Sequence, residues 1–184
     1  MFKFKVRTAR CFWIALIAPA FWVSLASADS ATAPALIAER LSLMKDVAIY
    51  KAKNGRPVED LEREAVVLDA AVAAAGDHGL EPETTRAFFQ AQIDAAKDIQ
   101  FCWLDKWAAT SQQPEGGADL VTELRPELLR LGNAIVEAIA ADIANGRSAP
   151  NPQSFRDAVA VECLGDESNT AIAKTLSGIT LRGE

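Results

Sequence analysis

The sequence predicts an all-α domain that follows a cleavable N-terminal segment. In residues 29–184, apolar residues recur at intervals of three and four, and Ala, Leu, Glu, Lys and Gln dominate. Both features favour helices over strands. About 156 residues without a Pro-rich or Gly/Ser-rich linker suit a single domain with its own core. We therefore expect one multi-helix, orthogonal or bundle-like domain over residues 29–184.

Residues 1–28 have the pattern of a secretory signal peptide. Four basic residues and no acidic one precede an apolar run over 11–25, which closes on the small triplet Ala26-Ser27-Ala28. The alternative is a membrane anchor, but a span needs roughly 20 apolar residues. We expect cleavage after Ala28, and a periplasmic or secreted mature protein without a membrane anchor.

The charge of the mature chain excludes some classes of partner. Removing residues 1–28 takes the formal net charge from −6 to −10, because that segment carries four cations and no acid. Nucleic acid and anionic membranes bind net basic surfaces, so neither is expected as a partner. A small anion needs only a local cluster of cations and stays possible.

Two cysteines remain after cleavage, Cys102 and Cys163. An even pair in an oxidising compartment favours a disulfide. The bond would close a loop of about 60 residues and stabilise the fold by roughly 4 kcal/mol. The alternative is two separate buried thiols.

The helices are predicted from the breakers between them. A first helix is expected over 34–53, ended by Asn54-Gly55, and a second from Pro57, accepted in a first turn, to about residue 75. A long third helix should run from 81–83 to the loop at 111–117. A fourth should cover 120–144 with a possible bend at Pro126, and two shorter helices should lie within 152–176.

Several kinds of chemistry lack the residues they need. The single histidine, His78, lies in a predicted solvated turn, and no G-x-S-x-G motif accompanies it. No His/Cys/carboxylate cluster has metal-ligand spacing, and no Gly-rich phosphate loop is present. Hydrolysis through a Ser-His or Cys-His pair is therefore not expected, nor is a metal site.

Cationic residues on apolar helices are the stronger signal. Arg40 and Lys51 are eleven residues apart, which places them on one helix face about 16 Å apart along the axis. Asp60, Arg63 and Glu64 share one side of the next helix, and Gln100 lies in an apolar run where its amide needs a partner. The alternative is ordinary solvated helix surface with ion pairs of a few tenths of a kcal/mol.

The order of these residues resembles a known family. Glu39-Arg40-Leu41, Tyr50-Lys51-Ala52-Lys53, Arg56-Pro57-Val58-Glu59-Asp60 with Arg63-Glu64, and Phe88-Phe89 with Gln92-Ile93 and Gln100 are similar to motifs of the all-helical, type II chorismate mutases. The signal peptide and the helices after Trp107 resemble the secreted branch of that family. The match is densest over 35–107 and loose after 150.

The resemblance implies a concerted [3,3] rearrangement of chorismate to prephenate without a cofactor. Catalysis would come from holding the compact substrate conformer and stabilising charge on the ether oxygen. Arg40 would then clamp a carboxylate, and Lys51 would bridge a carboxylate and the ether oxygen. Arg63 would help to hold a carboxylate.

The remaining roles follow from the same resemblance. Glu64, with the backbone near Asp60, would take the ring hydroxyl, and Gln100 would donate its amide to the ether oxygen. In the secreted branch a further arginine comes from the fourth-helix region of the same chain, with Arg125 as our candidate and Arg130 as the alternative.

One position departs from the family pattern. Ala96 stands where relatives often carry Ser or Thr, so that hydrogen bond is absent or is supplied by a neighbour such as Lys97. The family also implies a homodimer. The competing function is a non-catalytic, exported helical module that binds a small dicarboxylate, and binding without turnover would favour it.

Overall fold

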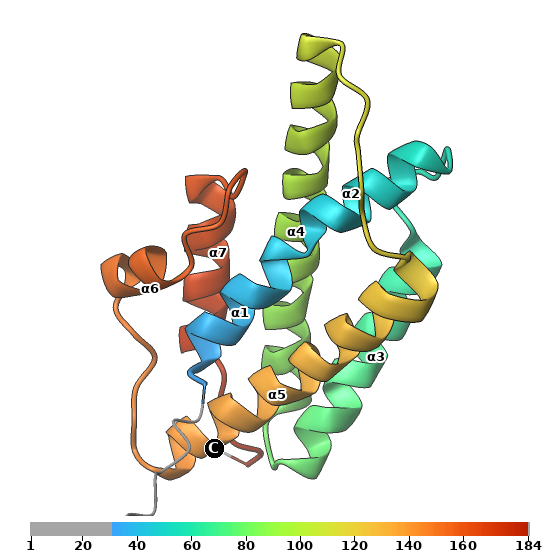
Figure 1. Ribbon diagram of the computed structural model, residues 1–184. Helices are drawn as coiled ribbons and strands as arrows, with labels where there is room; N and C mark the ends of the chain where they lie inside the picture. Colours follow the sequence, from blue (N-terminus) through green and yellow to red (C-terminus); the bar gives the residue numbers. More distant parts are fainter. Residues whose placement is uncertain (1–30, 184) are drawn as a thin grey trace, which may run out of the picture.

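The computed structural model describes residues 31–183, so the predicted signal peptide lies outside the described residues. Over that range the chain forms helices α1 to α7 and one short π-helix, η1, as Figure 1 shows. Their bounds are α1 Ala33–Ser42, α2 Met44–Lys53, α3 Leu61–Asp77, α4 Pro82–Thr110, η1 Leu120–Leu124, α5 Arg125–Ala144, α6 Pro152–Ala158 and α7 Asp166–Ser177. The predicted all-α class is confirmed.

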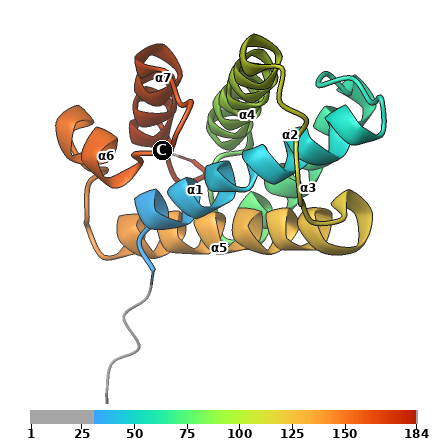
Figure 2. The ribbon, with the colours of Figure 1, turned by 45° about the horizontal axis from the view of Figure 1, so that its top comes forward.

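Helices α1 and α2 replace the single helix predicted over 34–53. Thr32 caps the start of α1 by accepting a hydrogen bond from the Ala35 amide, and a turn at Leu43 interrupts the helix. Leu43 keeps right-handed helical angles (φ −67°, ψ −12°), so the two segments follow one another in nearly the same direction, as Figure 2 shows. The predicted end is confirmed, because Asn54 caps α2 and Gly55 takes φ +59°.

Helix α3 begins later than the sequence predicted. Pro57 does not occupy its first turn, because residues 56–60 are not helical and Asp60 is the N-cap, accepting from the Arg63 amide at 3.1 Å. Val58 is buried in this connection. A carboxylate cap satisfies a free amide at the helix start, which proline at position 57 cannot do. At the other end α3 continues to Asp77, two residues beyond the prediction.

Helix α4 is the longest element and runs unbroken to Thr110, as predicted. Its far end projects beyond the other helices, and residues 111–119 return along it to η1 (Figure 1). The helix predicted over 120–144 begins as the π-helix η1, and α5 follows from Arg125, so Pro126 lies in the first turn of α5. Proline suits that place, because the first turn of a helix does not need its missing N–H.

One apolar core joins these helices. Phe88 and Phe89 on α4, Ile37 on α1 and Leu131 and Ile135 on α5 are all essentially inaccessible. Figure 2 shows α5 lying across one side of α1, while α7 stands beside α4. This packing places α1 to α5 around a common interior, and α6 and α7 extend the core at the opposite side of α4.

A disulfide connects the two parts. Cys102 on α4 is bonded to Cys163 in the turn before α7, so the predicted bond is confirmed and the alternative of two separate thiols is wrong. His78 is exposed and caps the end of α3, as expected for a turn histidine. No helix among residues 31–183 is both long and apolar enough to cross a bilayer.

Candidate functional site

A cavity of about 250 Å³ opens between α1, α2, α3, α4 and the η1–α5 segment. Its walls are mostly apolar, with a minority of charged and amide side chains. The charged and amide residues on its walls are Arg40, Lys51, Asp60, Arg63, Glu64, Lys97, Gln100, Arg125 and Asn133. The cavity therefore gathers every site residue that the sequence predicted, apart from the alternative Arg130.

Arg40 comes from the last turn of α1 and is 5% exposed. Its Nε and Nη1 atoms are buried without a hydrogen-bond partner. Burial lowers the pKa of Arg40 to about 10, yet the guanidinium stays protonated at neutral pH. A buried cation without a counter-ion is costly, so this wall of the cavity is suited to an anion that would provide one.

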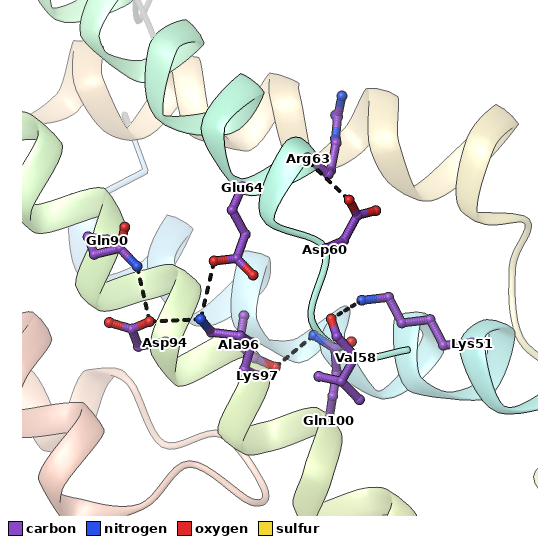
Figure 3. A network of polar contacts seen from close by, with 10 residues as sticks. All are labelled: Lys51, Val58, Asp60, Arg63, Glu64, Gln90, Asp94, Ala96, Lys97 and Gln100. Carbon is purple, nitrogen blue, oxygen red and sulfur yellow. Dashed lines mark hydrogen bonds and ion pairs between the residues drawn. The ribbon is translucent and has the colours of Figure 1, made fainter. Parts of the chain in front are cut away.

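Lys51 projects from α2, eleven residues or about three helical turns beyond Arg40, and is half-buried. Its ammonium donates a hydrogen bond to the Val58 carbonyl, which fixes it at the cavity wall as Figure 3 shows. The pKa of Lys51 is lowered because burial outweighs the attraction of Asp60 and Glu64, and the Arg125 charge lowers it further. Two cations thus repel each other across the same space.

The first turn of α3 supplies three charged residues. Asp60 is held by its capping bond, while Arg63 and Glu64 follow in the helix. Figure 3 shows Glu64 reaching across to α4, where its Oε2 accepts from Lys97 at 3.2 Å. The predicted common side of the helix holds, because all three residues line the cavity.

Gln100 is 4% exposed and sits in the middle of α4. Its Nε2 donates to the Ala96 carbonyl at 2.8 Å, and Met44 Sδ lies 3.8 Å from the same nitrogen. The Oε1 atom is buried without a partner. One N–H is therefore committed to the helix backbone, and the other meets only a weak sulfur acceptor that a ligand oxygen could replace.

Two arginines of the fourth-helix region, Arg125 and Arg130, were candidates for a further cation at the site. Arg125 lines the cavity at the junction of η1 and α5. Arg130 is more than half exposed and pairs with Glu127 (2.8 Å) and Glu39 (3.4 Å). It lies outside the cavity walls, so the alternative placement of the arginine at Arg130 finds no support in the geometry.

Sequence reasoning missed much of the wall built by α5. Leu128, Leu129, Gly132 and Asn133 all line the cavity along with Arg125. Their spacing from Arg125 is three, four, seven and eight residues, which is one face of a helix. That periodicity could have identified the face once Arg125 was chosen.

The charges on the walls determine what the cavity can hold. Five cations outnumber two carboxylates there, and the surrounding aliphatic walls lower the local dielectric constant, which strengthens each interaction with an anion. Among the described residues that line the cavity there is no Ser, Thr, Cys or His. Fold and site together define an all-helical protein whose cavity suits a small, multiply charged anion with an apolar body.

Comparisons with known proteins agree with that class. Residues 33–101 match the family described as chorismate mutase type II. The chain is 41% identical over 133 residues to a secreted chorismate mutase of Yersinia pestis, covering 70% of this chain and 69% of that protein. It is 35% identical to a monofunctional chorismate mutase of Enterobacter agglomerans, covering 72% and 70%. The chain belongs to the chorismate mutase family.

Solved structures of relatives share the fold. A secreted chorismate mutase of Yersinia pestis superposes with a TM-score of 0.75 at 34% identity, covering 82% of this chain and 97% of that one. A chorismate mutase of Burkholderia thailandensis gives a TM-score of 0.67 at 32% identity, covering 78% and 96%. The secreted relatives agree with the export that residues 1–28 predict.

Proposed function

We propose that this chain is an exported chorismate mutase that converts chorismate into prephenate in the cavity between α1 and α5. The observation that carries the proposal is the convergence of Arg40, Lys51, Arg63, Arg125 and Gln100 on one cavity. Family membership makes the isomerase class the expected activity, and the cavity supplies groups for its dianionic substrate. No role in the proposal falls to a metal or a cofactor.

The reaction does not require the protein to act as a general acid or base. In a [3,3] rearrangement one C–O bond breaks and one C–C bond forms in the same step, and no proton changes place. The barrier falls if the flexible enolpyruvyl ether is held in its compact conformer, with the reacting carbons close together. It falls further if fixed donors meet the charge that develops on the ether oxygen.

The two carboxylates are assigned to the cations. Arg40 is buried and unpartnered, so it binds one carboxylate at the inner end of the cavity. Arg63 and Arg125 hold the second carboxylate from α3 and from the start of α5. Lys51, fixed by the Val58 carbonyl, bridges a carboxylate and the ether oxygen. The charge repulsion among these groups is relieved when the dianion binds.

Gln100 and Glu64 are assigned to the uncharged oxygens. The second N–H of Gln100, which now faces Met44 Sδ, donates to the ether oxygen. Glu64, together with the backbone near Asp60, accepts from the ring hydroxyl. Ala96 lines the cavity beside them and offers no side-chain hydrogen bond.

The proposal assigns no role to a second subunit. All the assigned side chains belong to one chain, so the site does not need a residue from a partner. A homodimer stays a prediction from the family, and sedimentation equilibrium of residues 29–184 would measure it.

The test is turnover of chorismate by purified residues 29–184. We expect prephenate to form, and we expect Arg40→Ala and Lys51→Ala each to lower kcat/KM by two or more orders of magnitude, since each removes a charge that meets the substrate. Lys45→Ala is the matched control, because Lys45 also lies on α2 but stacks over Trp103 at 4.1 Å, away from the cavity.

Two results would contradict the proposal. One is near-normal activity in Arg40→Ala and Lys51→Ala variants whose circular dichroism remains helical. The other is tight binding of chorismate without turnover, which would favour the non-catalytic dicarboxylate-binding module instead.

A further inference from the structure

Lys97 is a cation on the cavity wall to which the proposed mechanism gives no task. It lies on α4, 20% exposed, one turn before Gln100. Its ammonium is directed toward two carboxylates, Glu64 Oε2 at 3.2 Å and Asp94 Oδ1 at 3.1 Å. The Lys97 ammonium therefore hydrogen-bonds to protein carboxylates and does not point into the open cavity.

Glu64 is the group through which Lys97 can act on a ligand. Its side chain crosses from α3 to α4 and is 16% exposed. Lys97 holds one of its two oxygens, and in Figure 3 the other lies on the side of Lys51 and Gln100. A carboxylate anchored by one oxygen presents the second in a fixed direction.

A second anchor keeps Lys97 in place. Gln90 donates to Asp94 at 3.0 Å, and Asp94 in turn holds Lys97, so four side chains form a line from the exposed side of α4 to the cavity (Figure 3). Asp94 is 55% exposed, and exposure falls along the line to Glu64. Burial opposes the charge on Lys97, but hydrogen bonds to Asp94 and Glu64 outweigh it, and its pKa is raised.

We propose that Lys97 is a positioning residue, which orients the Glu64 carboxylate so that its free oxygen accepts a hydrogen bond from the ring hydroxyl of the substrate. This inference rests on the proposed function and deepens it. It replaces the expectation that Lys97 supplies the hydrogen bond missing at Ala96. Two of the three ammonium hydrogens of Lys97 already have carboxylate acceptors, Glu64 and Asp94. Lys97 therefore acts on the substrate through Glu64.

The first test is Lys97→Met, which keeps the length of the side chain and removes its charge. The ring hydroxyl takes no part in bond making, so its hydrogen bond stabilises ground state and transition state alike. We expect KM for chorismate to rise about tenfold while kcat changes by less than about threefold, as for loss of one well-oriented bond to a charged group. Lys97→Arg should restore most of the lost affinity.

Lys106→Met is the matched control. Lys106 lies on the same helix and pairs with Glu162 at 2.7 Å, but neither residue lines the cavity. It should leave both kinetic constants unchanged. An equal rise of KM in Lys97→Met and Lys106→Met would assign the effect to general loss of charge and overturn the inference.

The decisive readout is a double-mutant cycle with Glu64→Gln. A residue that acts only through Glu64 should have no further effect once that carboxylate is gone, so Lys97→Met should cost less than about twofold in the Glu64→Gln background. The same tenfold cost in both backgrounds would mean that Lys97 meets the substrate itself. Unchanged KM in the single variant would also overturn the proposal.

Measuring affinity as well as turnover distinguishes failure of the Lys97 proposal from failure of the proposed function. Calorimetric titration with prephenate gives Kd for the same four proteins without any turnover. If the wild-type chain binds prephenate but does not rearrange chorismate, the proposed function fails and the cycle in Kd still decides the role of Lys97. If it neither binds nor rearranges, both proposals fall together.

Discussion

Arg40 destabilises the folded protein but provides a charge that the proposed function needs. A guanidinium with two buried, unpartnered nitrogens destabilises the folded state, and the lowered pKa of Arg40 reflects the same cost. Charged side chains are rarely kept in such places unless they bind something. The buried nitrogens of Arg40 are therefore available to hydrogen-bond a ligand in the cavity.

Arg40→Leu is therefore expected to stabilise the protein while it abolishes activity. Replacing an uncompensated buried charge by an apolar group of similar reach should raise the free energy of unfolding by about 1–3 kcal/mol. Urea denaturation of both proteins measures this. Arg130→Leu serves as the control, since Arg130 is exposed and ion-paired. An Arg40→Leu variant less stable than the wild type would contradict this account of Arg40.

Gln100 leads to a prediction about pH. An amide donates its N–H at any ordinary pH, so kcat should vary by less than about threefold between pH 5 and 8. A carboxyl at the same place donates only when protonated. Gln100→Glu should therefore lose activity as the pH rises through the pKa of that carboxyl. A steep loss of kcat above pH 6 in the wild type would count against Gln100 as the donor.

The disulfide acts at the scale of whole helices. Cys102 follows Gln100 by two residues on α4, and Cys163 precedes α7, so the bond ties the cavity-forming helix to the C-terminal pair. Neither cysteine lines the cavity, and no lining residue comes after Asn133 in the sequence. The bond thus braces α4 from behind without entering the cavity.

Removing the bond should cost stability and leave the chemistry intact. The sequence separation of 61 residues corresponds to roughly 4 kcal/mol in the chain-entropy picture. Cys102→Ala with Cys163→Ala should lower the free energy of unfolding by about 3–4 kcal/mol, while kcat/KM at 20 °C stays near that of the wild type. Unfolding curves with and without reductant check this. Equal stability of reduced and oxidised protein would contradict the bracing role.

Helix boundaries show where sequence reasoning succeeds and fails. The breaker Asn54-Gly55 acts locally, and α2 ends before it as predicted; α5 likewise ends at Ala144, the predicted last residue of the fourth helix. The start of α3 depends on a capping contact by Asp60 and on burial of Val58 in the fold, so Pro57 alone was a misleading signal. The turn at Leu43 has no breaker residue, and nothing in the sequence marks it.

The same distinction applies to the whole molecule. Arg40 and Lys51 were predictable because the turn at Leu43 keeps right-handed helical angles, so the eleven residues between them still bring both side chains to the same cavity. The line from Gln90 to Glu64 was not, because it crosses between α3 and α4 over 33 residues of sequence. The choice between Arg125 and Arg130 likewise needed the packing of α5 across α1, which directs one arginine to the cavity and the other to Glu39.

The central claim is that helix packing gathers these side chains around a single dianionic guest. A crystal structure of residues 29–184 with a rigid dicarboxylate shaped like the compact transition state tests it most directly. The account predicts one carboxylate within hydrogen-bond distance of Arg40, Lys51 near the ether oxygen, and the ring hydroxyl on Glu64. A guest bound outside this cavity, with Arg40 still unpartnered, would contradict it.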